Sequence, residues 1–276
     1  MILLAIALLQ SVGPNPRPPL SDPMLEQPVP RPKAEVPSAA PAQPQQAPRA
    51  SDEEQYRRCA DLAKANPEGA VTAANEWLVR GGGLYARQCL GLAYSGLERW
   101  EPAATAFEQA ASEAEINRDP RGADFRVQAG NAWLAAGDAG KARGAFDAAL
   151  ASTALTEEMR GEVHLDRARA LKALGDRPGA RADIDRALAL VPQDPLAWYL
   201  SSALALEDRQ LARAQDDIAK AVQLAPDNAD LLVFAGNLAG ISGEEQAARG
   251  LYARAIRVQP GSDAAKAAQA ALAAND

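Results

Sequence analysis

The chain has 276 residues, of which 47% are hydrophobic and only 5% aromatic, and 29 basic against 36 acidic residues give it a net charge of −7. The first 50 residues hold four basic and three acidic residues, a net charge of +1, so the remainder carries −8. Because an acidic domain repels phosphate groups, this composition argues against nucleic acid as a partner.

Residues 1–9 (MILLAIALL) form a short apolar run. The run is far shorter than the ~20 residues that a helix needs to cross a bilayer, so we expect no membrane span. Its length fits the apolar region of a signal peptide, although no Lys or Arg precedes it. We therefore expect an exported protein, periplasmic or secreted. A cytoplasmic location is the alternative if the run is not a signal.

Residues 10–50 hold 12 of the 20 prolines, with Gln, Ala and Ser between them. Such a segment can bury too little apolar surface to offset the entropy lost on ordering it. We predict a disordered, extended linker that acts as a spacer. A ligand for an aromatic groove is the alternative for Pro-rich sequence.

From residue 51 onward the sequence predicts helices in pairs. In residues 195–226, apolar residues recur twice at helical spacing, and the polar break EDRQ separates the two stretches. This pattern predicts two antiparallel helices joined by a short turn. Pro192, Pro226 and Pro260 are evenly spaced, so the unit repeats, and its 34-residue period is typical of helical hairpins.

Two kinds of residue recur at fixed places in these units. Small residues occupy one position of each first helix, and bulky apolar residues occupy one position of each second helix. The small residues are Gly91, Gly130, Ala168, Ser202 and Gly236, and the bulky ones are Phe107, Phe146, Ile184, Ile218 and Tyr252. A small residue lets two helices approach closely, and a bulky one fills the wedge between hairpins.

With its 34-residue period, this pattern resembles the tetratricopeptide repeat (TPR) family. The resemblance implies an all-α, right-handed superhelical solenoid of antiparallel helix pairs. We divide residues 51–262 into about six hairpins, at 51–83 (degenerate), 84–122, 123–160, 161–194, 195–228 and 229–262. Residues 263–276 should form a helix that caps the last hairpin, because a solenoid must cover its terminal face.

The only cysteines are Cys59 and Cys89, one on the first helix of each of the first two hairpins. Successive first helices of a solenoid run side by side, so a disulfide between them is geometrically feasible and would suit an exported protein. Two free thiols in an apolar interface are an equal alternative. Two cysteines alone make no zinc site, and we expect no metal or cofactor.

The only histidine, His164, lies between Glu162 and Asp166, but residues two apart on a helix point in nearly opposite directions. His164 also occupies the place where the TPR family often has Trp, so we predict a packed structural histidine. Asp183 and Asp217 lie on second helices among basic residues, which is typical of a solvated outer face. No catalytic set emerges, and we predict that the protein is not an enzyme.

Proteins that resemble this one bind partners along their first helices. The matching positions predict a peptide-binding groove, and its candidate residues are Asn131, Leu165, Arg169, Lys172, Leu196, Tyr199 and Asn237. Tyr199 should lie beside the two cations, which suits a peptide or helix with an acidic group. The alternative is that this concave surface is solvated and binds no partner.

We therefore predict a non-enzymatic scaffold that binds a partner peptide or helix in the concave groove of the solenoid. A self-associating structural component of the cell envelope is the alternative. The oligomeric state and the identity of the partner protein stay open.

Overall fold

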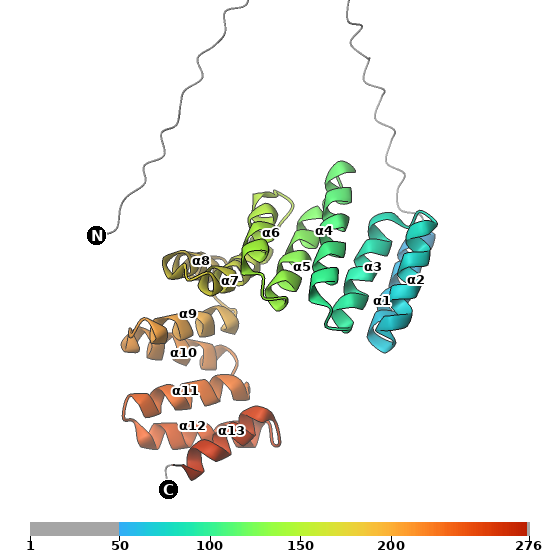
Figure 1. The fold of residues 1–276 in the computed structure, drawn as a ribbon. Coiled ribbons are helices and arrows are strands. Elements are labelled where there is room, and N and C mark those ends of the chain that lie inside the picture. The colour runs from blue at the N-terminus through green and yellow to red at the C-terminus, as the bar shows by residue number, and fades with distance from the viewer. Residues whose placement is uncertain (1–49, 275–276) are drawn as a thin grey trace, which may run out of the picture. The chain divides into compact units, whose positions relative to one another are not determined.

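The computed structural model describes residues 50–274, and every regular element in that range is a helix (Figure 1). The predicted signal-like run at 1–9 and the linker up to residue 49 lie outside the described residues. The helices are α1 (Ala50–Ala65), α2 (Pro67–Val79), α3 (Gly83–Gly96), α4 (Trp100–Ile116), α5 (Gly122–Ala135), α6 (Ala139–Ala151), α7 (Glu157–Ala173), α8 (Arg177–Leu190), α9 (Pro195–Glu207), α10 (Leu211–Leu224), α11 (Ala229–Ile241), α12 (Glu245–Val258) and α13 (Asp263–Ala273).

Helices that follow one another in the chain pack against one another throughout the described range. Each odd-numbered helix from α1 to α11 forms an antiparallel hairpin with the helix after it, and α13 packs on both α11 and α12 (Figure 1). The prediction of an all-α solenoid of helix pairs is confirmed. None of the helices in residues 50–274 combines the length and apolar character that crossing a bilayer demands.

Local sequence explains where these helices begin. Asp138, Asp176 and Ser262 each accept a hydrogen bond from a backbone N–H in the first turn of the helix that follows. Such N-caps satisfy amide groups that have no partner inside the helix. Pro195 opens α9 directly after its cap, where the missing amide of proline costs nothing.

From the second hairpin to the sixth, the turn between the two helices contains a residue with left-handed backbone geometry. Gly137, Gly175 and Gly243 have this geometry with φ of 82°, 81° and 77°, while Glu98 and Arg209 adopt φ of 55° and 59° at the corresponding turns. Glycine enters this region freely, whereas for other residues it costs roughly 1–2 kcal/mol. The turn geometry is therefore kept even where the sequence makes it unfavourable.

The small and bulky positions meet inside each hairpin. A Cβ atom added to Gly91 or Gly130 would lie 2.5 Å from the ring of Phe107 or Phe146, and one added to Gly236 would lie 2.6 Å from the ring of Tyr252. Glycine is thus required where the second helix supplies an aromatic ring. The fourth and fifth hairpins carry Ile in place of the ring, and there the first helix has Ala168 and Ser202.

Candidate partner-binding site

The predicted groove residues lie on the first helices α5, α7, α9 and α11, but they differ widely in exposure. Arg169, Lys172 and the two asparagines are exposed, and Leu196 keeps 48% of its surface accessible. Tyr199 is half-buried, and Leu165 is only 2% exposed. The structure therefore leaves most, but not all, of these side chains available to a partner.

Leu165 does not belong to an exposed surface. Its side chain packs in a core cluster with Ala187 of α8 and Ala197 of α9. The reason is that α7 lies between its own second helix and the next hairpin, so this position faces the helix α9 rather than solvent. Leu165 holds the fourth and fifth hairpins together and offers no contact to a partner.

Arg169 and Lys172 project from α7 toward solvent, and each already has an acidic partner. Arg169 Nη1 lies 3.1 Å from Asp166 Oδ1, and Lys172 Nζ pairs with Glu207 on α9. A small apolar notch of about 30 Å³ lies beneath the two cations, and Ala168, Arg169, Lys172, Ala180, Ile184, Leu200, Ala203 and Leu204 line it. The two cations are thus the rim of an apolar depression between α7 and α9.

Tyr199 was expected beside these cations, but its ring packs against the next hairpin. The rings of Tyr199 and Phe234 meet edge to face, with 5.1 Å between their centroids. The α9 residues around Arg169 and Lys172 are instead Leu200 and Glu207. Tyr199 consequently contributes to packing between α9 and α11 as well as to the surface.

Asn131 and Asn237 also differ in how freely a partner could reach them. Asn131 is exposed on α5, whereas Asn237 on α11 accepts a hydrogen bond of 2.8 Å from the hydroxyl of Tyr252 on α12. Asn237 therefore helps to hold its own hairpin together, and only part of its amide is open to a partner.

A buried charge cluster was missed by sequence analysis. Asp183 on α8 is only 1% exposed, so its expected place on a solvated face is wrong. Its Oδ2 accepts a 2.6 Å hydrogen bond from Arg167 Nε, its Oδ1 lies 3.1 Å from His164 Nδ1, and Arg186 Nη1 donates to Oδ1 over 3.0 Å. The packed structural role expected for His164 agrees with this contact.

The electrostatics of Asp183 follow from these contacts. Burial alone would raise the pKa of this carboxyl, but the hydrogen bonds from Arg167 and His164, with the charge of Arg167, hold it well below its usual range. Asp183 is thus a charged group inside the fold. A buried carboxylate of this kind depends on its full set of partners.

Asp217 occupies the same position one repeat later and is also buried, at 7% exposure. It accepts a 2.5 Å hydrogen bond from Ser201 Oγ, which in turn accepts one of 2.8 Å from Arg181 Nη1. One signal in the sequence could have revealed both carboxylates. Each directly precedes the bulky residue of its second helix, a place where Ala106 and Ala145 of earlier hairpins are buried.

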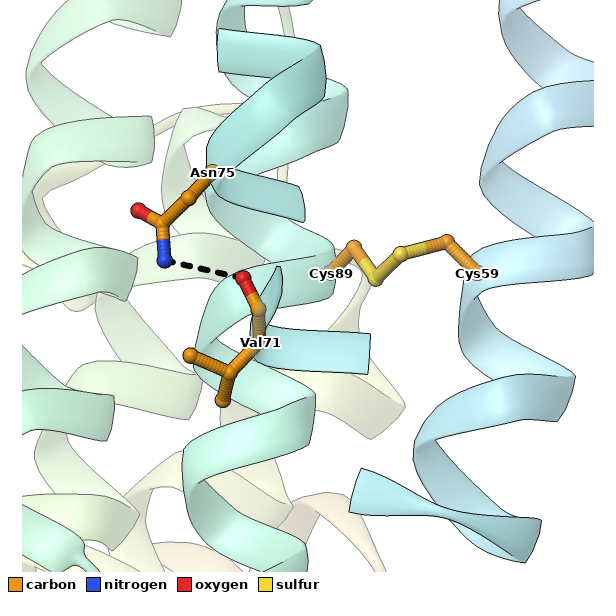
Figure 2. Close-up of a disulfide and its surroundings, with 4 residues drawn as sticks. All are labelled: Cys59, Val71, Asn75 and Cys89. Carbon is orange, nitrogen blue, oxygen red and sulfur yellow. Dashed lines mark hydrogen bonds between the residues drawn. A yellow bond between two sulfur atoms is a disulfide. The ribbon is translucent and has the colours of Figure 1, made fainter. Parts of the chain in front are cut away.

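The first two hairpins are joined covalently. Cys59 of α1 and Cys89 of α3 form a disulfide with 6.0 Å between their Cα atoms, and both cysteines are buried (Figure 2). Beside it, Asn75 Nδ2 on α2 donates a 2.8 Å hydrogen bond to the carbonyl of Val71 (Figure 2). Of the two alternatives for the cysteines, the structure contains the disulfide. Among residues 50–274, no group of three or more His, Cys, Asp or Glu side chains could hold a metal ion.

Comparison with solved structures identifies proteins of similar fold. No family model and no curated protein matches the sequence. Among solved structures, the type IV pilus biogenesis factor PilW is 21% identical, with a TM-score of 0.66 over 81% of this chain and 99% of its own. PilF of Pseudomonas aeruginosa is 18% identical, with a TM-score of 0.60 over 80% of this chain and 99% of its own.

A third similar structure is BtubC (BKLC) from P. vanneervenii, which is 18% identical with a TM-score of 0.58 over 76% of this chain and 88% of its own. The predicted TPR-like fold is confirmed. At these identities the likeness establishes the fold.

Proposed function

We propose that the protein is a non-enzymatic scaffold that binds a segment of a partner protein along the first helices α7, α9 and α11. We call the side chains on these helices that would meet the partner the inner wall; they are Arg169, Lys172, Leu196, Tyr199 and Val233. The exposure of Leu196 carries the proposal. Leu196 leaves 48% of its surface in water and lies three residues from the half-buried Tyr199, so the two side chains share one helix face that a partner segment could cover.

Apolar contact should supply most of the affinity. Burying apolar surface contributes roughly 25 cal/mol per Å², so covering Leu196 and the open edge of Tyr199 can give about 1–2 kcal/mol. An acidic group on the partner would have to displace Asp166 from Arg169 or Glu207 from Lys172. Exposed pairs of this kind each contribute only about 0–1 kcal/mol. The expected preference for a carboxylate therefore contributes less to the binding free energy than apolar contact does, and it would mainly set the orientation of the partner segment.

Export belongs to the same proposal. A disulfide persists in oxidising compartments and is rare in the cytosol of most organisms, so Cys59–Cys89 supports a periplasmic or secreted protein. PilW is described as a type IV pilus biogenesis factor. PilF is described only as a functionally characterised protein of Pseudomonas aeruginosa. They support the fold on which a partner would dock, and they leave the partner open.

Self-association in the cell envelope is the second candidate, and a different surface favours it. Val79 and Ile116 are 89% and 82% exposed at the C-terminal ends of α2 and α4. Ile116 lines one shallow groove, and Val79 directly follows Leu78, which also lines it. Two bare aliphatic side chains at one edge could pair with another copy of the chain.

Photo-crosslinking in the native host tests the proposal. A photoreactive residue in place of Ala203, which lines the notch on α9, should give one dominant adduct, identified by mass spectrometry. Leu196→Asp should reduce that adduct at least tenfold, while Val79→Asp, also at an exposed aliphatic position, should leave it unchanged. If the adduct is a second copy of the chain and Val79→Asp removes it, the self-association candidate is correct instead.

A further inference from the structure

A second hollow lies on the other side of α11. It has a volume of about 320 Å³ between α10 and α12, and its lining is Gln215, Ile218, Ala219, Val222, Ala235, Leu238, Ala239, Glu244, Ala247 and Leu251. We call it the α10–α12 groove. Its floor on α11 includes Ala235, two positions from Val233 of the inner wall. Residues two apart on a helix point in nearly opposite directions, so the two surfaces are separate.

The corresponding place one repeat earlier is filled by charged side chains. Counting back one repeat, Ala219 corresponds to Asp185 and Ala247 to Arg213. Arg213 Nη2 donates a 2.8 Å hydrogen bond to Asp185 Oδ1 and so bridges α10 and α8. Between α10 and α12 both of these bridging side chains are replaced by the methyl groups of alanine.

The floor of the α10–α12 groove is also apolar where the floor of the earlier site is polar. Ser201 of the earlier site, which binds Arg181 and Asp217, corresponds to Ala235 in the α10–α12 groove. Asp217 itself corresponds to Leu251. These polar groups of the earlier site are thus replaced by apolar ones in the later site, and an open apolar surface remains.

Charge marks one end of the α10–α12 groove. Gln215 closes this end by donating from Nε2 to Ser242 Oγ over 3.0 Å and to Glu244 Oε1 over 2.9 Å. Glu244 is the only charged residue among those that line the groove, and it is exposed. The described residues that line the groove include no Lys or Arg, so its charge is negative. A ligand that is apolar along its length and basic at one end complements this surface.

The dimensions fit a helix. Gln215, Ile218, Ala219 and Val222 line the groove from α10 at helical spacing, and seven residues of helix span about 10 Å. Two helical turns of a partner, with aliphatic anchors at i, i+4 and i+7, match that length.

We propose that the α10–α12 groove is a second docking site, which binds an amphipathic helix of a partner protein through two or three aliphatic side chains. A Lys or Arg at one end of that helix meets Glu244. This site is independent of the inner wall, so the scaffold can hold two segments on opposite faces of its last hairpins.

Two synthetic peptides test this site on the full chain. Both are 16-residue helices with leucine at the anchor positions, and the remaining positions are Lys-rich in one and Glu-rich in the other. Isothermal titration should show that the Lys/Leu peptide binds at least tenfold more tightly than the Glu/Leu peptide. Methyl NMR should show the largest shifts at Ile218, Val222 and Leu251.

The neighbouring repeat provides the matched variant. Ala219→Asp with Ala247→Arg rebuilds the Asp185–Arg213 bridge in the groove and should weaken Lys/Leu binding at least tenfold. Neither alanine is buried, so folding should survive, and circular dichroism checks this. Ala219→Lys, which repels the basic peptide, should weaken binding similarly, whereas Leu196→Asp on the inner wall should not.

Three results would overturn the proposal: equal binding of the two peptides, undiminished binding to both groove variants, or methyl shifts confined to the inner wall. A dimer that light scattering detects in the parent chain and not in the double variant would assign the groove to a second copy, which also overturns it.

Discussion

The third and fourth hairpins fill the same pair of helix positions with opposite chemistry. Ala129 and Ala145 are both buried in one core cluster of the hairpin of α5 and α6. At the same positions one repeat later, Arg167 meets Asp183 in the hairpin of α7 and α8. The small and bulky positions next to them are kept, as Gly130 with Phe146 and as Ala168 with Ile184.

The backbone arrangement therefore depends on the small and bulky positions. The position beside them tolerates either a methyl group or a charge, provided that the charge has its partners. An alanine pair is complete in itself, since it has no polar group to satisfy. A buried Asp needs Arg167, His164 and Arg186 together, because a buried charge without partners costs several kcal/mol. Three predictions test this difference, and a fourth compares the disulfide-linked hairpins with the later ones.

The largest effect is expected when the charge is moved into the apolar hairpin. Ala145→Asp places a carboxyl at a position that is 5% exposed, opposite Ala129 rather than an arginine. The free energy of unfolding should fall by about 4–5 kcal/mol, because the new group is buried without a partner. Urea denaturation measures this loss.

Ala148→Asp is the control for that change, since Ala148 is exposed on the same helix α6. It should alter stability by less than about 0.5 kcal/mol. Equal costs for the two substitutions would mean that the alanine hairpin accepts a charge and that the contrast between the hairpins is false.

Removing one partner from the charged hairpin should cost slightly less. Arg167→Ala leaves Asp183 buried with His164 and Arg186 only, and the free energy of unfolding should fall by about 3–5 kcal/mol. Arg167→Ala combined with Asp183→Ala recreates the Ala129–Ala145 arrangement and should recover at least half of the loss. A double variant as unstable as the single one would show that the charges are not the reason.

The disulfide offers another comparison between two parts of the chain, because no disulfide links the later hairpins in residues 97–274. Cys59→Ser with Cys89→Ser opens a link between residues 30 apart and should lower stability by about 3–4 kcal/mol in the chain-entropy model. Hydrogen exchange should rise mainly in α1, where Ala63 is the only other buried side chain among those described.

Thiol labelling of protein from the native host tests the same bond. The unfolded chain should label at neither cysteine until reductant is added. Two reactive thiols without reductant would contradict the disulfide and remove the support it gives to export.

The smallest change in stability is expected when the protein is acidified. The pKa of Asp183 is lower in the folded chain than the usual value of about 3.9, so its contribution to stability is complete above about pH 5 and is lost as the pH falls below 4. Chemical denaturation at several pH values should show a steeper acid loss for the parent chain than for Arg167→Ala with Asp183→Ala. Parallel curves would contradict the assignment.

The sequence was sufficient for the elements and for their pairing. Helical spacing and the 34-residue repeat are visible in the sequence because helix formation depends on local backbone geometry, which neighbouring residues control. For the same reason the meeting of Gly130 with Phe146 could be expected from the repeat alone, since both positions recur from hairpin to hairpin.

Part of the candidate site could be expected in the same way. Repeat positions indicate which residues lie on first helices, and Leu196, Arg169 and Lys172 are indeed exposed there. Periodicity does not show what the adjacent hairpin covers. Leu165 has the same register as Tyr199, yet it is buried because α8 and α9 close over it.

Only the tertiary structure determined which charges are inside and which surfaces are left open. A carboxylate beside several arginines has the same sequence pattern whether it lies in solvent or in a core, and it is the packing of α7 over Asp183 that distinguishes the two cases. The α10–α12 groove is likewise defined by the absence of side chains long enough to bridge two helices. Whether a gap stays open depends on the distance between those helices, which the packing of α11 sets and local sequence does not.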